Sequence, residues 1–479
     1  MTPLLLILFA ACTREATVYP PPELTTWGTT NTQVTGTDQT SPTGTTPTGT
    51  TTPTTDPEPE PVLQFDGPVP TNVLWLSIDT LRKDVWGAYG DVDALPFLNS
   101  KLEEGLSLSD AKQCTNWTWA GTTCGMSGSN NIDNDYIPCL CSRDGDRAPD
   151  SIKYIAEVFS DESWNSTLVT TNGWLDPDWN NTQGFDTVVR QGGQRAGVVL
   201  EKGLEQLETM SGSDNPWFLH LHFYDPHAPY NPPEEYLGAL DELEEVPWNL
   251  ANRDQHYDAR DDWPTMPPEE QALLEAHLRA RYEGEVLYMD DAFAEWWEIY
   301  DAQGYLDDTL VVVWADHGEA FWEHGRQTHA QTIYGEENDV TVYFWAKNLQ
   351  SGVFSGPSSV IDIGPTVLDA LDIPIPNSWT GVPLQDIQSD RIRYNDANAR
   401  EGIIQSIIRG EERILFYWRS GNVEVTDAST DPAEVINLYD PNSEQTLELW
   451  DLLLPRVEEA LEFVDTVRYE FVWPADLPH

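Results

Sequence analysis

The sequence predicts an α/β fold with a mainly parallel central sheet, helices on both faces of that sheet, and a small C-terminal antiparallel α+β subdomain. Apolar runs alternate with amphipathic segments along most of the chain, which is typical of parallel sheets covered by helices. Several of the apolar runs are continuous, as in strands buried on both faces. From about Gly402 the pattern changes to short β-type runs separated by hairpin turns.

The expected strands and helices follow one another in a regular order. The strand-like runs are residues 73–78, 167–170, 217–224, 310–315 and 340–345. The helix-like runs are residues 95–102, 152–159, 199–207, 269–300 and 360–371, with a last helix over 447–463. The acidic, Trp-rich stretch 237–268 shows neither period, so we expect an irregular insertion near the substrate.

Two segments precede these elements. Residues 1–12, MTPLLLILFAAC, form a short apolar run closed by small residues and Cys12. This run resembles a bacterial lipoprotein signal peptide, in which the cysteine becomes the lipidated N-terminus; an ordinary secretory signal is the alternative. Residues 13–70 are rich in Thr and Pro, and they cannot bury enough apolar surface to offset the entropy of ordering. We therefore expect a disordered tether on an exported protein, lipid-anchored to the membrane in the bacterial cell envelope, periplasmic or at the cell surface.

The charge balance is strongly acidic. The chain has 81 Asp and Glu against 25 Lys and Arg, a formal net charge of −56. Phosphate backbones require Lys and Arg for neutralisation, which argues against a nucleic-acid partner. A large excess of one charge keeps a protein soluble but destabilises it through self-repulsion. We therefore expect added salt to stabilise the fold.

The cysteines after Cys12 lie close together in the sequence, at Cys114, Cys124, Cys139 and Cys141. In an exported chain such cysteines are expected to form disulfides. Cys139 and Cys141 are too close to bridge each other comfortably, so each is expected to pair with Cys114 or Cys124. A zinc cluster is the alternative, but the spacing lacks the paired C-x2-C units of structural zinc sites.

Two of the buried strands end in acids. NVLWLSIDT (72–80) ends with Asp79 and Thr80, and VVVWADHGEAFWEHG (311–325) places Asp316 and His317 after its apolar run. Ligands of open α/β sheets bind outside the carboxyl ends of the strands. Carboxylates suit Ca²⁺ or Mn²⁺, and an imidazole favours Mn²⁺ or Zn²⁺. The sequence therefore predicts a site for one divalent metal ion, Ca²⁺, Mn²⁺ or Zn²⁺.

Five segments carry a resemblance to a known family. They are NVLWLSIDTLRKDVWGAYG, NWTWAGTT, FLHLHFYDPHAPYNPP, ADHGEAFWEHG and VIDIGPTVLDALDIPIPNSWTGVPL. In order and approximate spacing they are similar to the motifs of the sulfatase family, within the alkaline phosphatase superfamily. EVTDASTDPAEVINLYD also resembles the small terminal subdomain of that family. The resemblance implies an alkaline phosphatase-like catalytic domain over residues 71–390 and a C-terminal subdomain over 391–479.

The expected nucleophile departs from the usual sulfatase motif, C/S-x-P-S-R. The corresponding pentapeptide here is Thr118-Trp119-Ala120-Gly121-Thr122, and threonine cannot mature to formylglycine. Threonine in this place resembles the nucleophile of the superfamily's phosphodiesterases and phospholipid-headgroup transferases. The resemblance therefore implies a metal-bound Thr118 nucleophile, with Asp79, Asp316 and His317 completing a single-metal site.

The same resemblance assigns contacts with substrate. His227, in the DPHAPY turn, is expected to touch the non-bridging oxygens or protonate the leaving group. His329, or the alternative His324, lies where the family places a basic residue on the oxyanion; either could instead cap a loop. Arg82 is a candidate oxyanion clamp, with a surface salt bridge as the ordinary alternative. Asn172, Gly173 and Trp174 replace the lysine and histidine of the family's GKWH segment, so that set of oxyanion contacts is missing here and Asn172 is the substrate-binding candidate in its place.

Three further residues are weighed differently. His220 and His222 share one face of a strand and are expected to be hydrogen-bonded core residues. Asp225 could contribute to a second metal site, should one exist.

These observations predict an exported, metal-dependent hydrolase that cleaves an anionic sulfate or phosphate ester through metal-bound Thr118. The alternatives are a phosphoethanolamine- or glycerophosphate-type transferase and a non-catalytic sulfatase-like surface lipoprotein. No oligomeric state follows from the sequence.

Overall fold

The computed structural model describes residues 62–90, 92–140, 147–192, 195–400, 402–464 and 470–479. The expected signal peptide with Cys12, most of the expected tether, and Cys141 lie outside the described residues. The residues just before the first strand already pack on the domain. Leu63 is buried, and Phe65 forms an isolated antiparallel bridge with Leu349.

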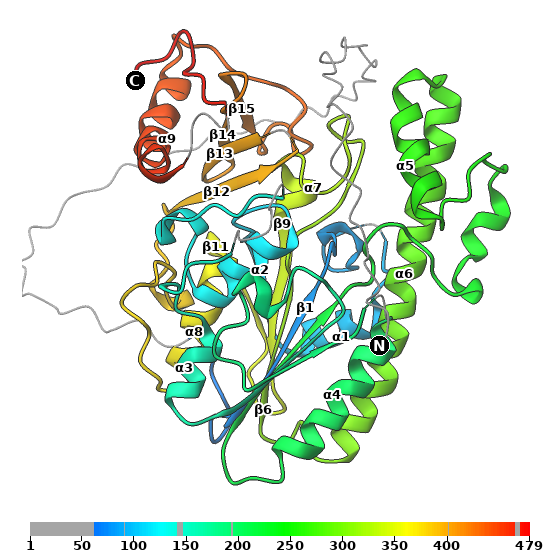
Figure 1. Cartoon of the computed structure of the whole chain (residues 1–479), viewed down its shortest axis with the longest axis vertical. Coiled ribbons are helices and arrows are strands. Elements are labelled where there is room, and N and C mark those ends of the chain that lie inside the picture. The colour runs from blue at the N-terminus through cyan, green and yellow to red at the C-terminus, as the bar shows by residue number, and fades with distance from the viewer. Residues whose placement is uncertain (1–61, 91, 141–146, 193–194, 401, 465–469) are drawn as a thin grey trace, which may run out of the picture. The chain divides into compact units, whose positions relative to one another are not determined.

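A nine-stranded sheet runs through the main domain (Figure 1). Its order is β10-β2-β9-β6-β1-β5-β3-β4, and β11 pairs with β2. Every pairing is parallel except the two that β9 makes with β2 and β6. The strands are β1 (Asn72–Ile78), β2 (Leu106–Lys112), β3 (Asn165–Thr170), β4 (Thr187–Arg190), β5 (Trp217–Phe223), β6 (Thr309–Ala315), β9 (Asp339–Trp345), β10 (Gly352–Phe354) and β11 (Ser358–Ser359).

Helices cover both faces of this sheet (Figure 1). On one face α4 packs on β3 and β5, and α6 packs on α4 and α1. On the other face α2 packs against α3 and α8, and α3 contacts β3. The helices of the main domain are α1 (Pro96–Glu104), α2 (Thr118–Ser127), α3 (Ile155–Asp161), α4 (Ala196–Met210), α5 (Arg253–Asp262), α6 (Pro268–Ala302), α7 (Gly335–Asn338) and α8 (Ile363–Ala370). The predicted fold class is confirmed.

The continuous apolar runs are explained by this two-sided cover. Every residue of β5 and β6 is buried, and in β1 only Asn72 is partly exposed. A strand covered by helices on both faces has no solvent-facing positions, so its sequence does not alternate. In the long helix α6, proline at the start and Glu269 and Glu270 in the first turn match the usual helix N-terminal signals.

The stretch 237–268 is not irregular throughout, as the sequence suggested. It contains α5, whose N-cap residue Asn252 accepts from the backbone N–H of Gln255. Only His256 and Ala259 of this helix are buried, so most of its positions are polar and its apolar period is too weak to show in the sequence.

The C-terminal subdomain is a four-stranded antiparallel meander with one helix. Its strands pair in the order β12 (Ile392–Ala399), β13 (Gly402–Arg409), β14 (Glu412–Tyr417) and β15 (Asn422–Asp427). Helix α9 (Glu444–Phe463) packs on β13 and β14 around an apolar cluster that includes Phe416, Trp418 and Trp450. Among the described residues, no helix combines the length and the apolar character needed to cross a membrane.

The expected cysteine pairing is wrong. Cys114 forms a disulfide with Cys124, and their Cα atoms are 6.5 Å apart. Cys139 is also disulfide-bonded. Cys114 follows β2 and Cys124 lies on α2, so the short loop between them folds back within bonding reach, which spacing alone could not decide. With these two sulfurs bonded to each other, the alternative zinc cluster is excluded as well.

Candidate active site

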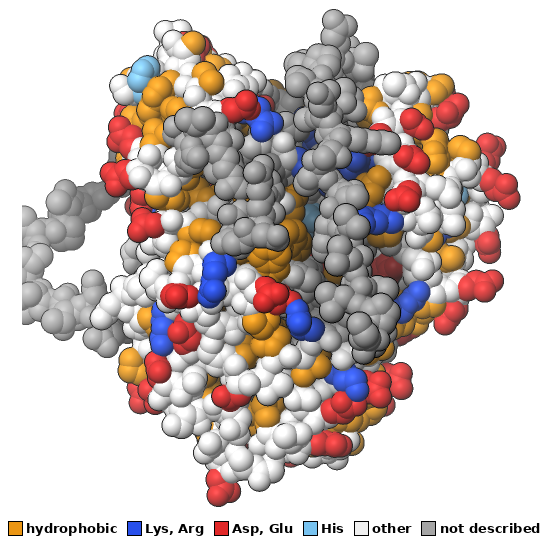
Figure 2. Space-filling model, in the orientation of Figure 1, with side chains coloured by type: hydrophobic (Ala, Val, Ile, Leu, Met, Phe, Trp, Pro, Cys, Tyr) orange, Lys and Arg blue, Asp and Glu red, His pale blue; other side chains and the backbone are white. Residues whose placement is uncertain are grey.

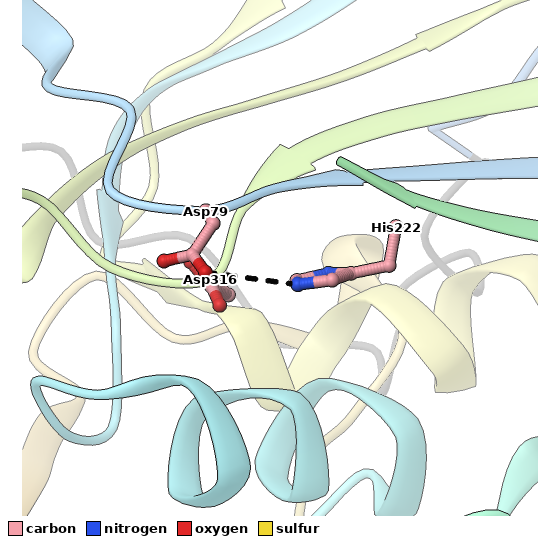
Figure 3. Close-up of side chains that lie close together, drawn as sticks. All are labelled: Asp79, His222 and Asp316. Atoms are coloured by element: carbon pink, nitrogen blue, oxygen red, sulfur yellow. Dashed lines mark ion pairs between the residues drawn. The ribbon is translucent and has the colours of Figure 1, made fainter. Parts of the chain in front are cut away.

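The carboxyl ends of three neighbouring strands bring Asp79, His222 and Asp316 together (Figure 3). One ligand atom from each of these buried side chains lies within 4.8 Å of the other two. His222 Nε2 is 3.9 Å from Asp79 Oδ2. The N–H of Asp79 donates to the carbonyl of Phe223, and that of Asp316 donates to the carbonyl of Ile78. These bonds continue the sheet ladder one step beyond the strands and fix both acids at its edge.

Thr118 and Asn172 complete the buried cluster. Thr118 begins α2, and its hydroxyl oxygen is 3.5 Å from Asp79 Oδ2. Asn172 Nδ2 donates to the same carboxylate oxygen at 2.6 Å and lies 3.3 Å from Thr118 Oγ1. The helix can approach because Gly121 lies against Asp316, where a Cβ atom would be 2.3 Å from the backbone oxygen. The threonine hydroxyl is therefore placed between an acceptor and a donor.

His317 adds a second imidazole. Its Nε2 is 3.4 Å from Asp79 Oδ1 and 3.7 Å from Asp316 Oδ1, while its Nδ1 donates to the carbonyl of Gly318. Asp79 Oδ1, Asp316 Oδ2, His222 Nε2 and His317 Nε2 are all buried without a hydrogen-bond partner. Orphaned polar atoms are costly in a protein interior. Four such atoms in one cluster supply the oxygen and nitrogen ligands that a divalent cation takes.

Burial and mutual charge set the protonation of this cluster. Burial raises the pKa of Asp316 well above its usual value, and the Asp79 charge adds to that effect while His317 opposes it. Burial also raises the pKa of Asp79, but the charges of His227, His317 and His222 outweigh it and lower the value. Burial lowers the pKa of His317, yet Asp316 and Asp79 raise it to about 10. A bound cation would take over the charge balance that His317 supplies here.

Two half-buried histidines lie beside the cluster. The rings of His227 and His329 are 4.8 Å apart, and the ring of His329 is 4.5 Å from that of His317. His227 Nδ1 donates to the carbonyl of Ala228, which leaves its Nε2 as the exchangeable nitrogen. Burial lowers the pKa of both imidazoles below the usual value. Both side chains are thus placed where a leaving group could exchange a proton.

Glu319 contacts one of these two histidines, His329. Its Oε1 is 3.1 Å from His329 Nδ1, and its Oε2 accepts from the Tyr230 hydroxyl at 3.0 Å. Burial raises the pKa of this carboxyl to about 7. Glu319 therefore fixes the orientation of the His329 ring.

Arg82 and His324 contact residues outside the cluster of ligand atoms. The Arg82 guanidinium pairs with Asp84 at 2.5 Å and with Glu323 at 2.8 Å. This matches the salt-bridge alternative rather than an oxyanion clamp, although the Arg82 side chain itself is buried while Asp84 is exposed. His324 Nδ1 is 2.7 Å from Glu336, and its ring stacks on Tyr334 at 3.7 Å. Of the two histidine candidates, His329 is the one that reaches the cluster.

The second-metal alternative for Asp225 finds no support in the described part of the chain. The one group of three clustered acid and imidazole ligands found there is that of Asp79, His222 and Asp316. Asp225 Oδ2 instead accepts from the backbone N–H of Ala196.

His222 differs most from expectation. The sequence suggested a core histidine, and this fits His220, whose Nε2 is 2.7 Å from Ser77 Oγ. His222 Nδ1 is 2.7 Å from the same hydroxyl, but its Nε2 faces Asp79. The available signal was the position of His222 near the end of a buried strand, next to the acid-ending strand in a parallel sheet. For Glu319, the only signal in the sequence was its position directly after Asp316-His317-Gly318.

Comparisons with known proteins show what this chain is similar to. The family model described as Sulfatase matches residues 71–373. An arylsulfatase of Clostridium perfringens is 26% identical over 307 residues, 61% of each chain. A multifunctional alkaline phosphatase superfamily protein of Trinickia caryophylli is 26% identical over 207 residues, 38% of each chain. The chain thus spans about three fifths of the length of the clostridial relative.

Solved structures show the same fold. One, determined in complex with its substrate D-glucosamine-2-N,6-O-disulfate, has a TM-score of 0.66 at 15% identity, covering 82% of this chain and 99% of that one. A phosphonate monoester hydrolase from Silicibacter pomeroyi has a TM-score of 0.63 at 19% identity, covering 82% and 96%. The family model covers more than half of the sequence, and its match contains Asp79, Thr118, His222 and Asp316. The chain therefore belongs to the sulfatase family.

Proposed function

We propose that this chain is a metal-dependent hydrolase that cleaves a sulfate or phosphate ester with Thr118 as its nucleophile. The observation that carries the proposal is the 3.5 Å separation between the Thr118 hydroxyl and the Asp79 carboxylate, inside a group of orphaned ligand atoms. An anionic ester bound there would meet a hydroxyl, an amide donor and two half-buried imidazoles. This combination suits attack on a charged ester.

Asp79 and Asp316, with His222, His317 or both, would hold one divalent cation. Carboxylate oxygens with imidazole nitrogens favour Mn²⁺ or Zn²⁺, and Ca²⁺ is compatible with the carboxylates. When bound, such a cation offsets negative charge on the ester and on the departing oxygen.

The chain's own residues support a two-step displacement. The Thr118 oxygen attacks sulfur or phosphorus, the bond to the leaving oxygen breaks, and the hydroxyl proton passes to Asp79 Oδ2, the oxygen that accepts its hydrogen bond. The leaving oxygen gains a proton, for which His227 Nε2 is the placed donor when that ring is protonated. Water then cleaves the threonine ester, releasing sulfate or phosphate and restoring the hydroxyl. During both steps the hydrogen bonds of the Asn172 amide keep the Thr118 hydroxyl and the Asp79 carboxylate in place.

The choice between sulfate and phosphate rests on two opposing features. The curated relative from Clostridium perfringens is named an arylsulfatase, which supports sulfate esters. The threonine in place of a formylglycine precursor supports phosphate monoesters or diesters. Assays must therefore include nitrophenyl sulfate, nitrophenyl phosphate and a bis-nitrophenyl phosphodiester.

The test is the pair Thr118→Val and Thr122→Val in the full chain. Both residues are buried threonines of α2, and the Thr122 hydroxyl donates to the backbone carbonyl of Thr118 instead of the cluster. Loss of the nucleophile should lower kcat by about a thousandfold or more, and the control should retain activity within about tenfold. Metal content by mass spectrometry should show one bound ion.

Three results separate the outcomes of this test. Mass spectrometry of the protein after incubation with a slow substrate should find a sulfuryl or phosphoryl group on Thr118. Wild type without bound metal and without turnover of any ester would favour the binding-lipoprotein alternative. Transfer of the group to added glycerol in preference to water would favour the transferase alternative.

We also propose that the chain is exported and lipid-anchored through Cys12. The support is the apolar run before Cys12, and the Cys114–Cys124 disulfide is typical of an oxidising compartment. Expression in a bacterial host with labelled palmitate should label wild type but not Cys12→Ala. Equal labelling of both would exclude the anchor.

A further inference from the structure

Two arginines at the exposed side of the site lack the ion pairs that most basic side chains of this chain form. Across the described residues, neither Arg253 nor Arg400 makes an ion pair with a carboxylate, although Asp and Glu outnumber Lys and Arg by 81 to 25. Both side chains are exposed. Figure 2 shows acidic side chains mostly towards the rim of the visible face and several basic ones nearer its centre. In so acidic a chain, arginines without an ion-pair partner are unusual.

Arg400 is tied to the histidine side of the site. Its backbone N–H donates to the carbonyl of Ala330 at 3.3 Å, and the N–H of Ala330 donates to the carbonyl of Asn116 at 3.1 Å. Ala330 follows His329, and Asn116 lies two residues before Thr118. The turn after β12 therefore rests on the loop that carries His329 and on the segment that leads to the proposed nucleophile.

Helix α5 brings the second arginine. Its buried His256 packs edge-on against Tyr230, with ring centroids 5.4 Å apart, and contacts the Gln327 side chain at 3.2 Å. Tyr230 in turn donates to Glu319, which orients His329. Helix α5 is thus connected through Tyr230 and Glu319 to His329, one of the two proposed leaving-group histidines.

Arg253, Tyr257 and Arg260 follow one another on α5 at intervals of four and three residues, which places them on one face of the helix. The guanidinium of Arg260 lies over the Tyr257 ring at 4.7 Å and pairs with Asp261, so Arg260 is already neutralised. Arg253 has no such partner among the described carboxylates. It is the free charge of this face.

The two arginines come from different elements, Arg253 from α5 and Arg400 from the turn after β12. Tyr224 stacks on His227 with ring centroids 4.4 Å apart, and Arg253 lies within electrostatic range of the Tyr224 hydroxyl. Arg400 lies within electrostatic range of His329, whose ring is 4.5 Å from that of His317. Exposure to solvent increases from the ester site to the arginines. Asp79 and Thr118 are buried, His227 and His329 are half-buried, and Arg253 and Arg400 are exposed.

We infer that Arg253 and Arg400, with Tyr257, form an anion-binding subsite at the exposed side of the ester site, which takes a second anionic group of the substrate. That group is a carboxylate, sulfate or phosphate that is not itself cleaved. Guanidinium groups without acidic partners suit such oxyanions, which they bind in a bidentate manner. The inference rests on the proposed function in one respect, because it makes the substrate an ester with at least two negative groups.

The test compares a polyanion with a single anion. Sucrose octasulfate and inorganic sulfate are titrated calorimetrically, at constant ionic strength, into the full chain, into the Arg253→Gln/Arg400→Gln double variant, and into Arg419→Gln. Arg419 is exposed in the turn between β14 and β15 and pairs with Glu470, so it controls for loss of charge elsewhere. The double variant should bind sucrose octasulfate about tenfold or more weakly and inorganic sulfate with less than about threefold change. The control should bind both anions as the wild type does.

Other results would overturn the inference. These are wild type that does not bind sucrose octasulfate, equal weakening for both anions, and the same loss in the Arg419 control. A double variant with Lys at both positions should recover most of the affinity, since it restores the charges. Binding needs no turnover, so a chain that cleaves no ester yet shows this pattern would refute the proposed function and leave the subsite standing.

Discussion

Ser77 has one hydroxyl proton and two histidines within reach of it. Its Oγ is 2.7 Å from His220 Nε2 and 2.7 Å from His222 Nδ1, so it donates to one ring and accepts from the other. If it donates to His220, then His222 carries its proton on Nδ1 and offers the Nε2 lone pair to Asp79 and Asp316. The reverse arrangement protonates Nε2 and removes a ligand. A cation therefore selects the first arrangement, and Ser77 supports it.

Replacing Ser77 by Ala should weaken metal binding about tenfold to a hundredfold, because outer-shell partners fix the tautomer and the ring of a histidine ligand. The measurement is the dissociation constant of Mn²⁺ and Zn²⁺ by calorimetry with the demetallated chain. Ser166→Ala is the matched control, since Ser166 is also buried in a parallel strand of the sheet but bonds to Gly184 and Asp186. Unchanged affinity in Ser77→Ala would remove His222 from the ligand set.

These residues also show what sequence could and could not indicate about the site. Asp79 and Asp316 were foreseeable because each follows a continuous apolar run, and parallel strands deliver such residues to one edge. The role of His222 depends on Ser77, which is 145 residues away and becomes its neighbour only through the pairing of β1 with β5. A histidine in a buried strand reads as core unless that register is known.

At the scale of elements, α6 holds the loop that follows β5. Asp225, three residues after His222, accepts from Ala196, and Glu285 of α6 accepts from the backbone N–H of Asn231 at 2.6 Å. The two carboxyls interact directly. Burial and the Asp225 charge raise the pKa of Glu285 to about 8, and burial raises that of Asp225. Glu285 is therefore protonated in the folded chain near neutral pH.

This pair predicts a pH dependence of stability. A carboxyl with a raised folded-state pKa binds its proton more tightly in the native state than in the unfolded chain, whose reference value for glutamate is 4.5. Its stabilising effect is complete below that value and is lost as the pH rises towards 8. The free energy of unfolding should fall by on the order of 5 kcal/mol across this window.

Urea unfolding of wild type and Glu285→Gln at pH 5 and pH 8 measures this effect. The amide cannot ionise, so the variant should lose less stability than wild type over the same interval. Glu298→Gln, at an exposed position of the same helix, should behave as wild type. Parallel pH profiles for wild type and Glu285→Gln would show that the contact does not titrate.

The elements themselves divide by how burial is distributed along them. β1, β5, β6 and β9 were predictable because helices or neighbouring strands cover them completely. β2 was missed, and its sequence LSLSDAK ends in three polar or small residues with a shift of register between Leu108 and Ala111. α5 was missed because it buries two side chains only. Elements with an irregular pairing or with few buried side chains owe their structure to tertiary contacts that leave little periodicity in the sequence.

At the scale of the whole molecule, we expect the repulsion from the net negative charge to exceed the stabilisation that local ion pairs provide. The described surface carries many ion pairs, such as Lys202 with Glu205 and Arg409 with Glu448. Exposed pairs of this kind contribute about 0–1 kcal/mol each and weaken as salt is added. Against them stands a formal charge of −56, whose repulsion acts across the whole folded chain.

Salt should therefore stabilise this protein. At about 1 M ionic strength the Debye length falls to about 3 Å, so repulsion between separated carboxylates is screened while the buried core is unaffected. We expect Tm to rise by about 5 °C or more between dilute buffer and molar KCl. Scans in sorbitol of equal osmolality separate screening from solute exclusion, since sorbitol carries no charge and should give a smaller gain. A Tm that stays level or falls in KCl would mean that the loss of ion pairs exceeds the relief of repulsion, and that the acidic surface does not limit stability.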